Sequence, residues 1–207
     1  RKSLCVVVML AAGCLLAQDL KPILLPQPQT DGGRPLMQAL KERKTTRDFS
    51  AEKLPSQILS NLLWAAFGVN RPDGKRTAPS AMNWQEIDIY VATSDGLFVY
   101  DARGNRLEPL LAQDVRPATG SQSFAATAPM DLVYVADLSK VGSTQDSELF
   151  TYADAGFIAQ NVYLFCASEG LATVVRGSID RVALAKMMKL RPEQKIILAQ
   201  TVGYPKK

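Results

Sequence analysis

The residues best suited to chemistry lie in one short stretch, 43–47. Three cationic side chains and two hydroxyls fall within these five positions. Arginine presents a planar fork of donors and lysine a compact charge, a combination that suits a phosphate monoester. The same residues would also serve as a solvated, positively charged helix end, which the helix dipole favours. The stretch alone leaves both interpretations open.

The chain contains no histidine. This excludes Ser-His-Asp and Cys-His catalysis, histidine general bases and histidine-ligated metals. Cys166 lies in an apolar run, so we expect a buried, inert thiol. The cysteine pairs of structural zinc sites are absent, and no metal site is predicted. Any chemistry must therefore come from carboxylates, lysine, arginine, tyrosine or a bound cofactor.

The overall composition is that of an ordinary globular protein. The 207 residues are 47% hydrophobic and 21% charged, with a formal net charge of +4. This charge is mild, and no basic stripe with interleaved aromatic residues is present, which argues against nucleic acid as a partner. Beyond the first 17 residues the length suffices for one domain, and no apolar run there is long enough to span a membrane.

The first 17 residues resemble a secretory signal peptide. Two cations precede the apolar run 4–16, after which Ala17 stands before a polar residue. A buried N-terminal strand or helix is the structural alternative. Cleavage after Ala17 would release the rest of the chain, whereas cleavage before Cys14 would leave a lipidated cysteine. We expect an exported, periplasmic protein in either case.

Residues 18–34 predict an extended arm. They hold three prolines and a Gly-Gly pair, which disfavour regular elements. We expect the apolar residues 23–25 to pack on the body of the protein. Asp31 or Gly32 is the expected cap of a helix at about 35–43. The cationic stretch would then follow this helix directly.

Apolar periodicity predicts the remaining elements. Helical spacing gives a second helix that begins near Pro55 or Ser56 and ends at Gly68. A long helix at 147–168 is apolar on nearly all sides, so we expect it to be buried. The other predicted elements are strands at 87–92, 96–100, 106–107, 130–136 and 195–204, short helices within 109–128, a strand or loop at 172–178 and a helix at 180–188.

A second polar segment, 79–85, lies between a loop and the strand that begins at 87. Its sequence, Pro-Ser-Ala-Met-Asn-Trp-Gln, contains more amide and hydroxyl groups than a simple capped turn requires. The stretch 43–49 resembles the Arg-Arg/His-Ser-x-Arg/Lys-x-Phe start of nitroreductase-family flavoproteins. The segment 79–85 resembles the Pro-Ser-x-x-Asn-x-Gln-Pro segment of the same family.

Further segments occupy the places that this family predicts. They are the end of the long helix at 169–171, the sequence Val-Arg-Gly at 175–177 and the terminal Thr-Val-Gly-Tyr-Pro at 201–205. The Ile-Leu-Leu-Pro motif of the arm and the strand 97–101 look closer to the SagB-type dehydrogenase branch. The resemblance covers about residues 20–207, and it depends on the order of the motifs because each is weak alone.

The resemblance implies an α+β fold with three layers, in which helices flank a central, mostly antiparallel sheet. The FMN-binding domain would span 35–207, preceded by the arm 18–34. Members of the family work as intertwined homodimers with FMN sites at the interface. The long apolar helix would then lie in the dimer core.

The resemblance also implies particular flavin contacts. The phosphate, the ribityl chain and the N1–O2 edge would be held by Arg43, Lys44, Thr45 and Arg47. The partner subunit's flavin would be contacted by Pro79, Ser80, Met82, Asn83 and Gln85. The ring would lie along Val175, Arg176 and Gly177, with Lys206 or Lys207 reaching the phosphate. Two residues depart from the family pattern: Glu86 replaces a second proline, and Arg176 replaces a common acidic residue.

The implied activity is FMN-dependent oxidoreduction with ping-pong kinetics. NAD(P)H would pass hydride to flavin N5, and a nitro, quinone-like or other small acceptor would then take the electrons. This scheme needs no protein acid–base residue, in agreement with the missing histidines. NAD(P)H is scarce outside the cytoplasm, so two alternatives stay open. They are a SagB-like flavin-dependent oxidation of a substrate and a non-catalytic, exported FMN-binding module.

Overall fold

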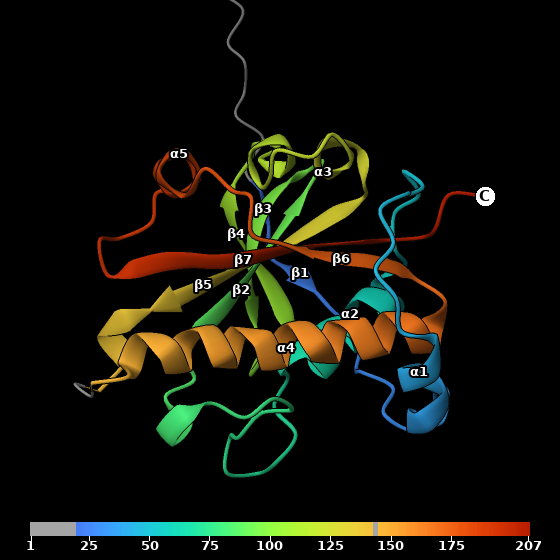
Figure 1. Cartoon of the computed structure of the whole chain (residues 1–207), viewed down its shortest axis with the longest axis horizontal. Coiled ribbons are helices and arrows are strands. Elements are labelled where there is room, and N and C mark those ends of the chain that lie inside the picture. The colour runs from blue at the N-terminus through green and yellow to red at the C-terminus, as the bar shows by residue number, and fades with distance from the viewer. Residues whose placement is uncertain (1–19, 143–144) are drawn as a thin grey trace, which may run out of the picture.

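The computed structural model describes residues 20–142 and 145–207 (Figure 1). The predicted signal peptide at 1–17, with its alternative lipidation site Cys14, lies outside these ranges. Within the two described ranges, no helix is long and apolar enough to cross a membrane.

An antiparallel sheet forms the centre of the described chain. Its seven strands have the spatial order β1-β4-β3-β2-β5-β7-β6. The strands are β1 (Ile23–Leu24), β2 (Ile87–Thr93), β3 (Gly96–Asp101), β4 (Arg106–Leu111), β5 (Met130–Asp137), β6 (Ala172–Arg176) and β7 (Gln194–Gly203). Every pairing is antiparallel, and β6 is hydrogen-bonded to β7 at one edge of the sheet. The predicted strands are thus confirmed, with β4 longer than expected.

Helices cover both faces of the sheet. They are α1 (Leu36–Glu42), α2 (Ser56–Phe67), α3 (Phe124–Thr127), α4 (Ser147–Glu169) and α5 (Arg181–Met187), with short 3-10 turns η1 (Ala81–Asn83), η2 (Arg116–Ala118) and η3 (Leu138–Lys140). One core joins α2 and α4 to the sheet, for example through Leu62, Ile158 and Tyr134. A second core packs Leu184 of α5 against Val133 of the opposite sheet face. The predicted α+β architecture is confirmed.

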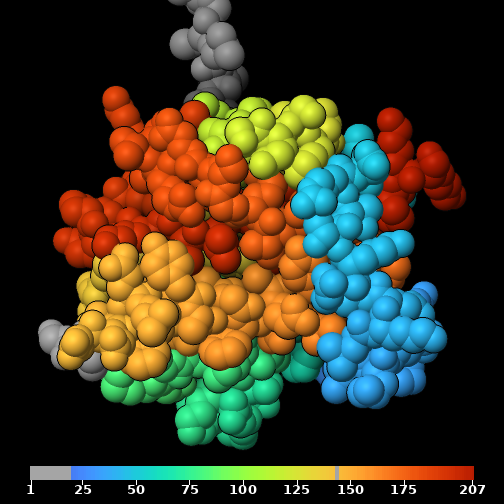
Figure 2. Space-filling model, in the orientation of Figure 1, coloured from blue at the N-terminus to red at the C-terminus, as the bar shows by residue number. Residues whose placement is uncertain are grey.

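The longest element, α4, runs across the whole molecule (Figure 1). Its N-terminal half lies beside η1, and α1 packs against its C-terminal half. The prediction that α4 is buried on all sides was wrong for the single chain. Its exposed apolar side chains are Leu149, Phe150, Tyr152 and Phe157. The helix α4 forms a band across the face seen in Figure 2.

The N-terminal arm attaches differently from the prediction. Leu25 is buried, but Ile23 and Leu24 are 41% and 76% exposed. The arm is bonded mainly through its backbone, since β1 pairs with β4 and the Leu25 N–H donates to the Asn105 carbonyl at 3.1 Å. The predicted cap at Asp31 or Gly32 is also wrong, because Pro35 stands at the start of α1 without a side-chain cap.

Candidate functional site

The cationic loop, residues 43–47, follows α1 and lies along β6 at the edge of the sheet. The Thr46 N–H donates to the Thr173 carbonyl of β6 at 3.0 Å. Directly after the loop, the Asp48 carbonyl accepts from the Lys206 N–H at 3.2 Å. The loop is therefore held between the outer edge of β6 and the C-terminal tail, where the backbone of Lys206 lies beside Asp48.

Tyr163 of α4 joins the cationic loop to β6. Its hydroxyl accepts from the Val175 N–H at 3.0 Å and shares a hydrogen bond with the Thr45 hydroxyl at 3.1 Å. The Arg43 guanidinium lies over the ring, 5.3 Å from its centroid. Tyr163 was not predicted as a site residue, because its only signal in the sequence was a hydroxyl on a largely apolar helix.

Gly170 makes the sharp exit from α4 that places β6 beside the loop. Its φ and ψ are 71° and 23°, in the left-handed region, and its N–H donates to the Cys166 carbonyl. A glycine adopts this conformation without the steric penalty that a Cβ brings. The next strand begins two residues later, at Ala172. The chain therefore turns directly from the helix into the site.

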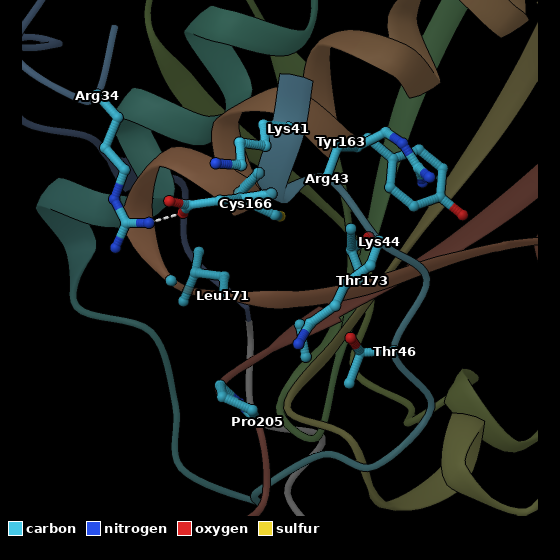
Figure 3. Close-up of a pocket in the computed structure, with 14 residues that line it drawn as sticks. Arg34, Lys41, Arg43, Lys44, Thr46, Tyr163, Cys166, Leu171, Thr173 and Pro205 are labelled. Atoms are coloured by element: carbon cyan, nitrogen blue, oxygen red, sulfur yellow. Dashed lines mark ion pairs between the residues drawn. The ribbon is translucent and has the colours of Figure 1, made fainter. Parts of the chain in front are cut away.

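A cleft of about 600 Å³ opens between the cationic loop, the end of α4 and β6 (Figure 3). Its charged lining residues are Arg34, Lys41, Glu42, Arg43 and Lys44, and Arg34 forms an ion pair with Glu42. Four cations against one carboxylate give the cleft a positive field that suits an anionic ligand. Cys166, at the cleft wall, is buried as predicted, and burial raises its pKa well above the usual range.

A second groove of about 1050 Å³ adjoins this cleft, because Gly170 and Pro205 line both. It contains Lys206 and Lys207 of the C-terminal tail beside Glu52. Together the two hollows bring the cationic loop, the tail lysines and β6 to one end of the molecule. Arg47 belongs to the loop but does not line the first cleft.

Val175 and Arg176 at the end of β6, and Gly177 directly after the strand, differ in the direction they face. Residues 173 and 175 direct backbone groups to the outer edge, where Thr173 and Val175 bond the loop and Tyr163. Strand alternation puts the N–H of exposed Gly177 on the same edge. The Arg176 side chain points to the interior instead and is buried, so it is the backbone of this residue that remains at the strand edge.

Arg176 is the centre of a buried polar network. Its guanidinium donates to Asp131 at 2.6 Å, to the Thr201 hydroxyl at 3.1 Å and to the Thr119 carbonyl at 2.8 Å. The Arg176 and Asp131 side chains are 2% and 0% exposed. Burial raises the pKa of Asp131 to about 6, against the opposing effects of Arg176 and Thr201. This pairing could not be predicted from the sequence, because its members are far apart in the chain.

The segment 79–85 lies elsewhere, against the N-terminal half of α4. The Ala81 N–H donates to the Asp154 carboxylate at 2.8 Å. Asp154 and Tyr163 are nine residues apart on one helix, which corresponds to roughly 14 Å along its axis. In a single chain the two groups of predicted flavin contacts are therefore separate, and only the group of loop, β6 and tail residues comes together.

The segment 79–85 is also unusual in its backbone. Met82, Asn83 and Gln85 have φ of 49°, 55° and 49°. Left-handed conformations are unfavourable for residues with a Cβ. Internal bonds support the turn: the Gln85 N–H donates to the Ser80 hydroxyl at 3.0 Å, and the Gln85 amide donates to Asn83 at 3.0 Å. The segment is a defined structure rather than a simple capped turn.

Comparisons with known proteins agree with this geometry. The chain matches the nitroreductase family model over residues 40–204. A candidate nitroreductase of Methanocaldococcus jannaschii is 29% identical over 168 residues, covering 75% of this chain and 85% of that protein. The crystal structure of a candidate nitroreductase from Ralstonia eutropha has a TM-score of 0.87 at 44% identity and covers 93% of both chains.

A third structure adds a bound cofactor. It is a candidate nitroreductase from Desulfovibrio desulfuricans in complex with FMN, similar at a TM-score of 0.63 and 20% identity over 85% of this chain and 89% of that one. At this identity the likeness concerns the fold. The family model covers most of the described chain, and this chain covers 85% and 93% of the lengths of the Methanocaldococcus and Ralstonia proteins. The chain therefore belongs to the nitroreductase family.

Proposed function

We propose that the chain is an FMN-dependent oxidoreductase whose flavin lies at the cleft beside β6. The observation that carries this proposal is the position of the cationic loop along an exposed strand edge. The Thr46 N–H bonds β6 directly, and the Tyr163 hydroxyl bonds both the loop and the Val175 N–H of β6. These hydrogen bonds hold the loop at a fixed distance from the strand. A phosphate-bearing ring system needs such a pairing of cations with backbone donors.

The residues present fit FMN. The phosphate would be held by Arg43 and Lys44, which line the cleft, and by the tail lysine Lys206, which lines the adjoining groove. Thr45 is already bonded to Tyr163 and would present its hydroxyl toward the ribityl chain. The ring would lie along the edge of β6, where the Gly177 N–H faces outward. Arg47, exposed on the same loop, would approach the N1–O2 edge. When bound, FMN supplies the hydride-transfer chemistry that this chain otherwise lacks.

A second copy of the chain would complete the site. Nitroreductase-family proteins are typically dimeric. The exposed face of α4 carries Leu149, Phe150 and Phe157, with Ala153 and Gly156 between them. In a twofold pairing through this face, the N-terminal half of one α4 would lie over the C-terminal half of the other. Segment 79–85 of one copy would thus approach the cleft of its partner, which the single chain does not allow.

The protein's part in the reaction would be binding and orientation. Cations beside the flavin stabilise negative charge that develops on reduction. NAD(P)H is the proposed donor, and a nitro, quinone-like or other small compound is the proposed acceptor, each using the same open face in turn. Substrate choice would then depend on the shape of the pocket.

The test is a visible spectrum of the purified chain, followed by anaerobic addition of NADH or NADPH. We expect a yellow protein that bleaches within seconds and regains its colour when an acceptor is added. A yellow protein that stays oxidised would point instead to flavin-dependent oxidation of another substrate or to a non-catalytic flavin-binding module. A protein that cannot be loaded with FMN would overturn the proposal. An Arg43→Gln variant, compared with Arg103→Gln in a distant turn, tests whether the cleft holds the phosphate.

A further inference from the structure

The strained segment 79–85 depends on contacts with neighbouring elements. Ala81 bonds to Asp154 of α4, and Trp84 makes an edge contact with Phe150 of α4, with 6.4 Å between ring centroids. The Arg76 Nε also donates to the Gln85 side chain at 2.9 Å. Because three residues hold left-handed conformations that are unfavourable alone, the segment requires these external contacts.

Glu86, the residue directly after this segment, is buried, and no donor from another described residue reaches its carboxylate. It has 0% exposure, and within the described residues neither of its carboxylate oxygens has a partner. Asp154, itself 3% exposed, lies within hydrogen-bonding reach of it. Two buried carboxylates at this distance strongly disfavour simultaneous ionisation. A proton on Glu86 would turn it into a donor to Asp154 and would satisfy both groups.

We propose that Glu86 and Asp154 form a proton-sharing carboxyl pair that positions the segment 79–85 on α4. Asp154 is held at the same time by the Ala81 N–H, so the shared proton links both ends of the segment to one side chain. Loss of the proton would place two negative charges side by side and would loosen the segment. Both residues act through the segment and are therefore positioning residues.

The surrounding charges support this assignment. Burial raises the pKa of Glu86 to about 7, and the Asp154 carboxylate adds to the effect. Burial likewise raises the pKa of Asp154. Lys140 of η3 opposes the shift, but its Nζ is paired with Asp88 of β2 at 3.0 Å. The pair therefore retains its proton under mildly acidic conditions.

The sign of the pH dependence follows from the raised pKa. An unfolded glutamate releases its proton near pH 4.5, whereas folded Glu86 holds it to about pH 7. The stabilisation from the shared proton is complete below pH 4.5 and is lost as the pH rises to about 7. Above that pH, we expect the folded chain to be less stable and the segment to be looser.

The effect of this carboxyl pair on flavin binding rests on the proposed function, in which segment 79–85 approaches the cleft of the second copy. The test of the pair itself needs no flavin. If FMN fails to bind while the carboxyl pair behaves as described below, the proposed function fails and the pair stands. If FMN binds but the pair does not titrate, this inference alone fails.

Trp84 provides the readout. The chain has two tryptophans, so a Trp64→Phe background leaves Trp84 as the only indole reporter. We expect its emission to change with a midpoint near pH 7. Glu86→Gln keeps a neutral donor toward Asp154 at every pH, so the emission should stay at its low-pH value. Its thermal midpoint should exceed that of the parent increasingly as the pH rises from 5 to 8.

A matched variant shows whether the loss of a carboxylate elsewhere in the chain changes the Trp84 signal. Glu108→Gln, on β4 and paired with Arg106 at the surface, should leave the Trp84 midpoint unchanged. Asp154→Asn removes the second carboxyl and should lower the midpoint, which provides the test if the Glu86 variant does not fold. A midpoint that persists in Glu86→Gln, or that is unmoved in Asp154→Asn, overturns the proposal.

Discussion

Tyr163 joins three parts of the candidate site through one side chain. Its hydroxyl bonds the cationic loop and β6, while its ring lies under Arg43. A tyrosine can do this because its apolar ring packs on the helix while its polar end reaches a partner. The position of the cations therefore depends on a residue that bears no charge.

We predict that Tyr163→Phe weakens FMN binding on the order of tenfold. Each lost hydrogen bond contributes roughly 0.5–1.5 kcal/mol, and 1.4 kcal/mol corresponds to a factor of ten. Fluorescence titration of the flavin measures the dissociation constant. Tyr90→Phe is the control and should bind normally, because it removes a hydroxyl on β2 that accepts from the Gln194 side chain away from the cleft. Equal affinities in both variants would contradict the assigned role of Tyr163.

The buried ion pair between Arg176 and Asp131 is another interaction between single residues, and it contributes to the stability of the fold. Asp131→Asn would leave a buried guanidinium without its counter-charge, so we expect the free energy of unfolding to fall by about 3 kcal/mol or more. Urea denaturation followed by circular dichroism measures the change. The control is Asp95→Asn, whose exposed pair with Lys53 should contribute roughly 0–1 kcal/mol. A comparable loss in both variants would show that burial does not decide the effect.

At the scale of elements, α4 determines where the parts of the site lie. Asp154 near one end supports the segment 79–85, and Tyr163 near the other supports the loop. Gly170 then reverses the chain so that β6 returns along the same end. One helix thus sets the distance between two groups of predicted flavin contacts.

Replacement of Gly170 by alanine tests the exit from α4. The surroundings leave room for a Cβ, so the cost comes from the φ of +71° alone. We expect the free energy of unfolding to fall by about 1 kcal/mol, as measured by thermal denaturation. Gly32→Ala also has open space but no positive φ, so it should change stability by less than about 0.5 kcal/mol. Equal effects of the two substitutions would argue against a conformational role for Gly170.

The whole molecule presents α4 as an exposed band between the sheet and the segment 79–85 (Figure 2). Large apolar side chains at several points of this band remain accessible in the single chain. Several exposed apolar side chains on one helix are typical of an interface. The proposed flavin site would therefore be complete only in the proposed dimer.

We predict that Phe157→Glu impairs dimer formation. The phenylalanine is 48% exposed on the outer face of α4, and a charge there would be buried in the proposed interface at high cost. Sedimentation velocity should show a shift from dimer to monomer, with at least about tenfold weaker association. Val182→Glu, at an exposed site on α5, should leave the dimer intact. A Phe157→Glu protein that remains dimeric would exclude this face as the interface.

Most of the elements were predictable because their signals are local. The apolar run at 130–136 indicates a buried strand, and β5 is buried along its whole length. Asp180 precedes the predicted helix at 180–188, and its side chain caps α5 by accepting from the Ala183 N–H. The region after β3 was harder. Short helices were expected across 109–128, but β4 extends to Leu111 because its pairing with β3 outweighs a proline at position 109. The cationic loop was recognised, whereas its partner Tyr163 was not.

The sequence by itself determined the residue types, the order of the elements and the family, because composition, periodicity and motif order are properties of neighbours in the chain. Only the tertiary structure decided which distant groups meet. Arg176 carries the same charge as the loop cations, yet it turns inward because Asp131 lies on the strand beyond β7. Glu86 is separated from Asp154 by 68 residues in sequence, and packing of segment 79–85 on α4 makes them neighbours. Contacts between distant residues require a fold before they exist.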